Sequence, residues 1–120
     1  PDLEEAVLGA LMLEKHALTV VIEFLRAEHF YKDQHQEIYK AILDLFSATE
    51  PVDMRTVVSQ LRKNGTLELA GGAFYIAELT SKVSSAANVE YHSRIIIELA
   101  IKRSLIQIAS ASLNLPSSVA

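Results

Sequence analysis

The sequence predicts an all-α protein, built as a small multi-helix orthogonal bundle that is followed by one long C-terminal helix. Three observations lead to this fold class. Apolar residues recur at spacings of three and four in every segment, which places them on one face of a helix. No stretch alternates between apolar and polar residues, as a half-buried β-strand would. Prolines, glycines and polar turn residues separate the segments and keep most of the helices short.

The segment from Asp33 to Phe46 is the predicted central helix, on which the others would pack. Asp33 followed by Gln36 fits a capping box at its start, and Pro51 closes the segment. Its apolar residues follow the i, i+3, i+4, i+7, i+8 pattern of a single helix face. That face consists of Ile38, Ala41, Ile42, Leu45 and Phe46.

Two further helices are predicted before the central one. Asp2 and Glu5 fit a capping box at the start of the first helix. Gly9 lies inside this helix, where glycine costs about 1 kcal/mol relative to alanine, so we expect it to permit a close helix crossing. The second helix is predicted from Ala17 to Leu25.

Two short helices are predicted after the central one. Asp53 is placed to cap the first of them, and Asn64-Gly65 supplies the left-handed stop that helices favour. Leu67 and Leu69 are expected to cover the core from a loop or short turn. The apolar residues between Phe74 and Leu79 then predict a short fifth helix.

The last helix, predicted from Val89 to about Leu113, carries apolar residues on two faces. Ser85 or Asn88 can cap it, and Pro116 ends it. A helix that is apolar on two faces needs two partners, of which one is the rest of the domain and the other is a further segment or another copy of the chain. One face consists of Ile95, Ile96, Leu99, Ile106, Ala109 and Leu113. The other face, called the outer stripe below, is the predicted oligomer or partner interface and consists of Ile97, Ile101, Leu105 and Ile108.

Length and composition indicate one soluble domain of the cytoplasm. A chain of 120 residues can bury a sizeable core without disulfides or a metal. The absence of cysteine fits a reducing compartment, and neither a signal peptide nor a membrane-spanning run is evident. Because the chain starts at Pro1, we expect a piece of a longer protein with a helical head (1–85), a long arm (86–113) and a flexible tail (114–120).

No catalytic, cofactor or metal site is predicted in this chain. The sequence holds neither a G-x-x-x-x-G-K-[ST] phosphate loop nor a G-x-S-x-G nucleophile motif. The nearest approach to a metal cluster is His29, Asp33 and His35, which lack the i, i+4 spacing of ligands on one helix face. We expect His35 to be a partly buried residue in the first turn of its helix.

The charge balance argues against nucleic-acid binding as the main role. The net charge is −4, whereas domains that grip a phosphate backbone are usually basic. The alternative function is a helical nucleic-acid-binding module, which would rely on Arg55, Arg62 and Lys63, or another protein-interaction module. The four tyrosines lack interleaved basic residues, so we expect them in the core or at interfaces rather than stacked on bases.

Five short segments also occur in a recognisable order. They are Glu5 to Leu13; Phe30-Tyr31 with His35, Ile38, Tyr39, Ala41 and Ile42; Pro51 to Asp53 with Leu61 to Gly65; Leu67-Glu68 with Gly71 to Leu79; and Ser85 to Val89 with Tyr91, Arg94 to Ile96, Lys102-Arg103 and Leu105-Ile106. This ordered set resembles the N-terminal domain of the bacterial replicative DNA helicase, the DnaB family. The resemblance covers roughly Leu3 to Ala109.

The resemblance implies a helical head followed by a helical hairpin, of which the long helix is the first arm. It also implies a homo-oligomer, in which dimers assemble into a collar on a hexameric ring that docks the helicase-binding domain of primase. A helicase loader is a further partner that the resemblance allows. ATP and Mg²⁺ would belong to a separate RecA-like motor domain of the parent, through which DNA is contacted, so this fragment would be no enzyme. After Ser112 the sequence departs from the family pattern of a returning hairpin helix.

Overall fold

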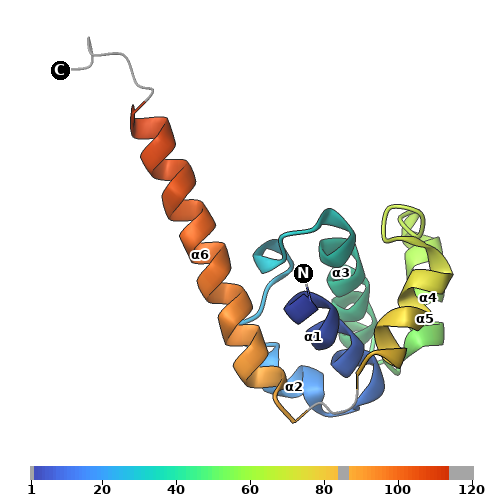
Figure 1. The fold of residues 1–120 in the computed structure, drawn as a ribbon. Helices are drawn as coiled ribbons and strands as arrows, with labels where there is room; N and C mark the ends of the chain where they lie inside the picture. The colour runs from blue at the N-terminus through green and yellow to red at the C-terminus, as the bar shows by residue number, and fades with distance from the viewer. Residues whose placement is uncertain (1, 84–86, 114–120) are drawn as a thin grey trace.

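A computed structural model of the chain describes residues 2–83 and 87–113, with side chains described as far as residue 110. This part contains six α-helices, one 3-10 turn and no β-strand, so the predicted fold class is confirmed. The first five helices form a head, and the sixth runs past it and away as a rod (Figure 1). The elements are α1 (Asp2–Leu13), α2 (Ala17–Val21), η1 (Ala27–His29), α3 (Asp33–Ser47), α4 (Met54–Asn64), α5 (Gly72–Ser81) and α6 (Val89–Leu113).

Several expectations concern residues outside this description. They are the flexible tail at 114–120, the stop at Pro116, the cap at Ser85 and the side chain of Leu113. Among the helices that are described, none combines the length and the apolar character required to cross a bilayer.

The helix at the centre of the head is α1, so the prediction that α3 would be central is wrong. By backbone proximity, α1 lies next to all five of the other α-helices, whereas α3 lies next to α1, α4 and η1. The run from Ala6 to Leu13 contains no polar side chain, and a helix that is apolar all round can be covered on every side. α3 instead keeps a solvent-facing side with Lys40 and Asp44 exposed.

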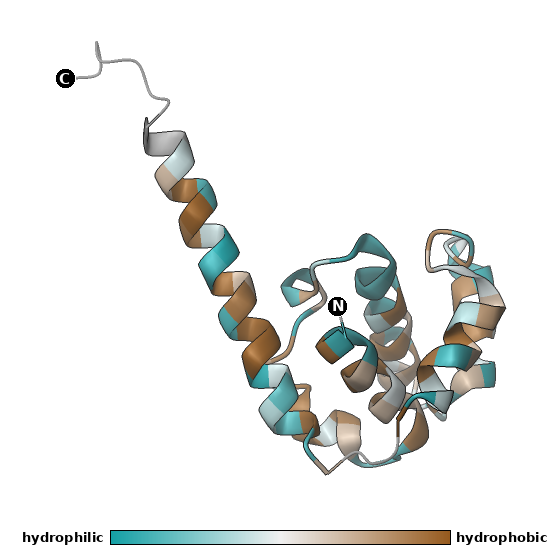
Figure 2. Cartoon of the chain, viewed as in Figure 1, coloured by the Kyte–Doolittle hydropathy of each residue, from teal (hydrophilic) through white to brown (hydrophobic). Residues whose placement is uncertain are grey.

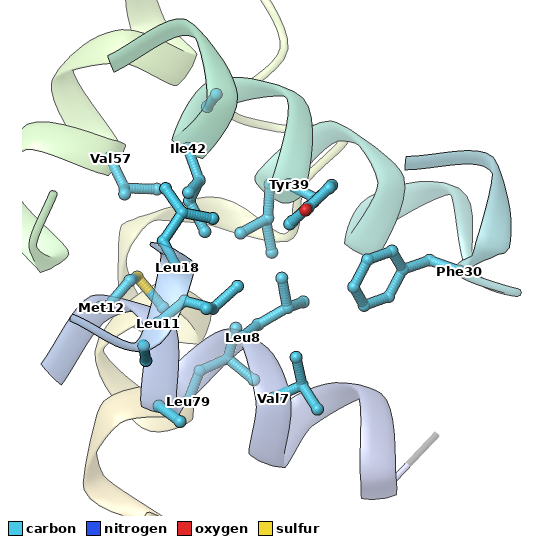
Figure 3. Close-up of a cluster of buried hydrophobic side chains, with 14 of the residues drawn as sticks. Val7, Leu8, Leu11, Met12, Leu18, Phe30, Tyr39, Ile42, Val57 and Leu79 are labelled. Carbon is cyan, nitrogen blue, oxygen red and sulfur yellow. The ribbon is translucent and has the colours of Figure 1, made fainter. Parts of the chain in front are cut away.

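One hydrophobic core joins the elements of the head. In Figure 3 the side chains of α1 meet those of α2, α3, α4 and α5, and Phe30 closes one end of the cluster. Tyr39 is fully buried in this core and donates its O–H to the carbonyl of Leu25 at 2.8 Å. Its burial raises the pKa of Tyr39 to about 12, so the phenol stays neutral and keeps this hydrogen bond.

Gly9 permits the close helix crossing that the sequence predicts. A Cβ atom at this position would collide with the backbone carbonyl of Leu79 and with a methyl group of Val83. α1 and α5 therefore approach each other at a distance that only glycine allows.

The local signals of α4 are confirmed. Asp53 precedes the helix, and its Oδ1 accepts a hydrogen bond from the backbone N–H of Thr56 at 2.9 Å. The helix ends at Gly65, which has a left-handed φ of 75°.

The two other predicted capping boxes are wrong. Lys32 precedes α3 and gives it no side-chain cap, while Gln36 donates to the carbonyl of Phe30 at 2.8 Å. α1 already includes Asp2, and Glu5 turns toward α5 to accept a hydrogen bond from the Tyr75 hydroxyl. In both cases the second residue of the expected box bonds a group outside its own helix.

Two apolar residues are placed differently from the prediction, and a third is exposed within its predicted helix. α2 ends at Val21 rather than at Leu25, although Leu25 remains buried. Leu67 packs against the core as expected, but Leu69 is 53% exposed. Phe74, inside α5, is 75% exposed.

Candidate functional site

α6 contacts the head through a single line of side chains in its first half. The helix touches α1, α2 and η1. Its buried residues are Val89, Ser93, Ile96 and Ala100, which are three or four apart and therefore lie on one line. Ser93 and Ala100 are small, and their size allows the helix to lie close to the head. The sequence prediction weighed the large aliphatic residues and so missed this line.

Beyond Ala100, α6 leaves the head and projects freely. Within residues 101–110, every side chain is exposed except that of Arg103, which is half-buried. We call residues 89–100 the docked half and residues 101–113 the free half. Figure 2 shows apolar stretches continuing along α6 where the helix extends away from the head.

The structure divides the outer stripe between the two halves. Ile97 is half-buried against the core of its own head. The other three members lie on the free half, where Ile101 is 54%, Leu105 59% and Ile108 62% exposed. Their role as an interface stays a prediction.

The opposite face of α6 is also more exposed than predicted. Ile96 is buried, but Leu99 and Ile106 of the same face are 45% and 65% exposed. At about 100° per residue, the docked line runs between these two apolar faces. Both faces of the free half are therefore open.

Burying this exposed aliphatic surface against a partner would be energetically favourable. Over half of each side chain among Ile101, Leu105 and Ile108 is in contact with water, so covering them would contribute about 1–2 kcal/mol per residue. Contiguous apolar surface of this kind marks interaction sites in soluble proteins. The free half of α6 is accordingly the candidate interface.

Arg103 holds α6 to the head at the point where the two separate. Its Nη2 donates to the backbone carbonyl of His29 at 3.0 Å, and its guanidinium carbon lies 5.1 Å from the centre of the Tyr31 ring. Burial lowers the pKa of the His29 imidazole, and the charges of Arg26 and Arg103 act in the same direction against that of Glu28. The neutral His29 Nδ1 accepts a hydrogen bond from the backbone N–H of Arg26 at 2.9 Å.

Two hollows flank this joint, and Arg103 lines both of them. One of about 550 Å³ lies between η1 and the start of the free half, where it includes Ile101 and Leu105. The other, of about 420 Å³, lies between α1 and α6 and includes Leu3 and Leu99. The joint thus has a concave surface on either side of a single cation.

A buried polar network lies behind the joint and connects α1, α3 and α5. His35 is fully buried, not partly buried as predicted. Its Nδ1 lies 2.7 Å from Glu4 Oε1, and its Nε2 lies 2.6 Å from the Tyr75 hydroxyl. The Tyr75 hydroxyl also lies 3.1 Å from Glu5 Oε2, and Glu4 Oε2 accepts the backbone N–H of Tyr31 at 2.7 Å. The network therefore reaches Tyr31, which lies beneath Arg103.

The network also shifts the acidity of its members. Burial by itself raises the pKa of Glu4, but hydrogen bonds from His35 and from the backbone N–H of Tyr31 outweigh it and lower that pKa below the ordinary 4.5. Burial, followed by the charge and hydrogen bond of Glu5, raises the pKa of Tyr75 well above 10. Glu4 is therefore a buried carboxylate that accepts hydrogen bonds from His35 and from the backbone N–H of Tyr31.

A third hollow, of about 880 Å³, lies at the other end of the head. It is formed by the end of α1, α2 and the segment after α3, and it includes Leu13 and Phe46, which are 55% and 42% exposed. Phe46 is thus not part of the core, contrary to the apolar face predicted for α3.

The remaining candidate residues do not come together. Both ring nitrogens of His35 lie within hydrogen-bond distance of Glu4 and Tyr75, and in the described residues no three potential ligands gather around one point. Arg55, Arg62 and Lys63 are all exposed on α4, away from the contacts of α6.

The structure is thus a small helical head with a long helix that is docked over its first half and exposes apolar side chains over its second. Comparison with known proteins assigns this architecture to a family. The model of the DnaB-like helicase N terminal domain matches residues 1–98. The chain belongs to this family, and the resemblance seen in its sequence is confirmed.

Individual relatives agree with this assignment. The replicative DNA helicase DnaB of Rhodothermus marinus is 49% identical over 102 residues, which are 85% of this chain and 11% of that protein. The replicative DNA helicase DnaC of Bacillus subtilis (strain 168) is 43% identical over 109 residues, which are 91% of this chain and 24% of that protein. The chain thus spans a quarter or less of the length of these helicases.

Solved structures show the same fold. The crystal structure of the N-terminal domain of DnaB helicase from Mycobacterium tuberculosis has a TM-score of 0.88 at 40% identity, covering 92% of this chain and 80% of that one. A structure of a DnaB-like replicative helicase and its interactions with primase has a TM-score of 0.78 at 30% identity, covering 91% of this chain and 25% of that one.

Proposed function

We propose that this chain is an assembly and docking domain of a hexameric replicative helicase. Its free half of α6 would pack against another copy of the chain or against further helices of the parent. The observation that carries this proposal is the exposure of Ile101, Leu105 and Ile108 on a helix that already packs against its own head through its first half. Paired domains of this kind would form the collar of the helicase ring.

Docking of primase during DNA replication is the second part of the proposal. It is supported by the similarity, over 91% of this chain, to a helicase described with its primase interactions. No reaction is assigned to this chain. ATP and Mg²⁺ would be bound by a separate motor domain of the parent helicase.

Self-association can be tested by placing charge on the free half. We expect the double variant Ile101→Glu with Leu105→Glu to have a lower mass by multi-angle light scattering than the unaltered chain, because carboxylates in an apolar interface are costly to desolvate. Circular dichroism should show the head still helical, since both positions lie outside the core.

A matched control adds the same charge at polar positions. Ser104→Glu with Gln107→Glu introduces two carboxylates at exposed sites of the same helix and should leave the mass unchanged. A wild-type chain that is monomeric at millimolar concentration, or a control that dissociates as fully as the apolar variant, would contradict the proposed interface.

The docking part can be tested by calorimetric titration with the helicase-binding C-terminal domain of a primase. We expect binding to the associated wild-type form and weaker binding to the Ile101→Glu, Leu105→Glu variant if assembly builds the site. Absence of binding to both forms would refute the docking role.

A further inference from the structure

The docked line of α6 ends in a charged residue. Arg103 follows Ala100 by three positions, so it lies on the same line as Val89, Ser93 and Ile96 and faces the head. Its side chain has a hydrogen bond to the carbonyl of His29 and a contact with the ring of Tyr31, both in the head. An arginine thus occupies the position where an apolar docked line would have its next contact.

A second arginine contacts the head from within the docked half. The guanidinium carbon of Arg94 lies 4.4 Å from the centre of the Phe24 ring, and the same side chain bonds Glu90 one turn earlier. Arg94 and Arg103 are nine residues apart, which is about 14 Å along the helix axis. α6 is therefore attached at two separated points by a cation over an aromatic ring, in addition to its apolar line.

The platform under Arg103 is itself fixed by the buried network. The backbone N–H of Tyr31 donates to Glu4 Oε2, and the other oxygen of Glu4 lies 2.7 Å from Nδ1 of His35. Glu4 is 5% and His35 0% exposed, so water has little access to either side chain. Tyr31 has an exposed ring but an anchored backbone, which suits a surface that must hold another side chain in place.

We propose that Arg103 is a positioning residue that fixes the direction in which the free half of α6 leaves the head. This inference rests on the proposed function, because that direction decides where the exposed apolar faces meet a partner. Arg103 acts from the head side and takes no part in the contact itself. Its planar guanidinium combines a hydrogen bond with a stacked contact, which a lysine cannot reproduce.

The geometry of the rod magnifies small changes at the joint. Ser110 lies 14 residues beyond Ile96, or about 21 Å along the axis. Rocking of α6 by about 10° around Ile96 would move Ser110 by about 4 Å. A change of this size would misalign a helix–helix interface, whose side chains interdigitate at interaxial distances of about 8–10 Å.

Distance measurements between two labels test this inference directly. The chain has no cysteine, so Ser59→Cys on α4 and Ser110→Cys on α6, both exposed, can carry nitroxide labels. Pulsed electron spin resonance then reports the distance distribution from the head to the free half. The labelled chain carries Ile101→Glu and Leu105→Glu and is diluted with unlabelled protein, so that packing with other copies does not hold the arm.

We expect Arg103→Ala and Tyr31→Ala each to broaden the distribution by 4 Å or more. Tyr31→Phe should restore the narrow distribution, because a phenylalanine ring still supports the cation. Lys102→Ala removes an exposed positive charge at the adjacent position and should change nothing. Thermal unfolding of every variant by circular dichroism establishes that the head is intact at the temperature of measurement.

A distribution that stays narrow in Arg103→Ala, in a folded head, would show that the apolar line alone sets the direction and would overturn the inference. A distribution that broadens equally in Lys102→Ala would overturn it as well. Because the labels report a single chain, this result does not depend on self-association. A chain that fails to associate but keeps the Arg103 effect would refute the proposed function alone.

Discussion

Replacement of Gly9 by alanine tests how the head is held together. At an exposed helix position this change would stabilise the protein by about 1 kcal/mol through helix propensity. At position 9 the new methyl group would occupy space already filled by the carbonyl of Leu79 and by Val83. The two effects have opposite signs, so the outcome discriminates between them.

The expected loss of stability in Gly9→Ala depends on which atoms must move to make room for the methyl group. The Leu79 carbonyl is backbone of α5 and cannot rotate away, so α1 and α5 would have to separate. Overpacking of a closed contact costs about 1–3 kcal/mol and sometimes more, and we place this site at the upper end. After subtraction of the gain from helix propensity, the free energy of unfolding should fall by about 2 kcal/mol. For a domain of this size, that loss lowers the melting temperature by about 6–10 °C.

Urea unfolding followed by circular dichroism measures this free energy. The matched control is the pair Ser59→Gly and Ser59→Ala on α4, an exposed site where alanine should be the more stable variant by about 1 kcal/mol. A Gly9→Ala variant as stable as the wild type would mean that α1 and α5 are not in close contact, and the reasoning would fail.

Three further predictions concern side chains that form hydrogen bonds, and each is measured by urea unfolding. The pKa of Glu4 is lower in the folded state than the ordinary 4.5, so the stability that its ionised form contributes is complete above that value and is lost as the pH falls through the folded pKa. The difference in free energy of unfolding between wild type and Glu4→Gln should therefore narrow from pH 6 to pH 3. A difference that stays constant over this range would contradict the prediction. Asp53→Ala should cost about 1 kcal/mol by removing the cap on Thr56, while Asp53→Ser retains most of it. Tyr39→Phe should cost about 1 kcal/mol because the buried carbonyl of Leu25 loses its donor, and an unchanged stability would refute that bond.

Some features of the fold depend on residues that are close together in the sequence. The cap at Asp53 and the left-handed stop at Gly65 depend on residues within one helical turn, and both were predictable. The close approach at Gly9 was predictable as well, because a glycine inside a helix has a cost that packing must offset. The 25-residue length of α6 followed from an uninterrupted run between two breaks.

Other features depend on residues that are distant in the sequence. The contacts of His35 with Glu4 and Tyr75 span 31 and 40 positions, so no local pattern indicates them. A run without polar side chains in α1 indicates its central position. The more regular amphipathic pattern of Asp33 to Phe46 favoured α3 instead. A clear stripe marks a helix with one buried face, which is a peripheral position.

The candidate interface was predictable in kind but not in extent. The sequence indicates that α6 has more apolar surface than one partner can cover. The line of α6 that contacts the head includes Ser93 and Ala100, whose small size makes them weak signals in a search for hydrophobic faces. The outer stripe therefore included Ile97, which the head already half covers.

The continuity of α6 across the joint has a consequence for variation in chain length. One residue inserted between Ala100 and Ile101 would rotate everything beyond it by about 100° and advance it by about 1.5 Å. The apolar faces would then point in new directions with no change in composition. Seven inserted residues would restore the orientation to within about 20° while lengthening the rod by about 10 Å. Insertions and deletions near this point therefore preserve the direction of the apolar faces only in multiples of about two helical turns, a restriction that the loops of the head do not share.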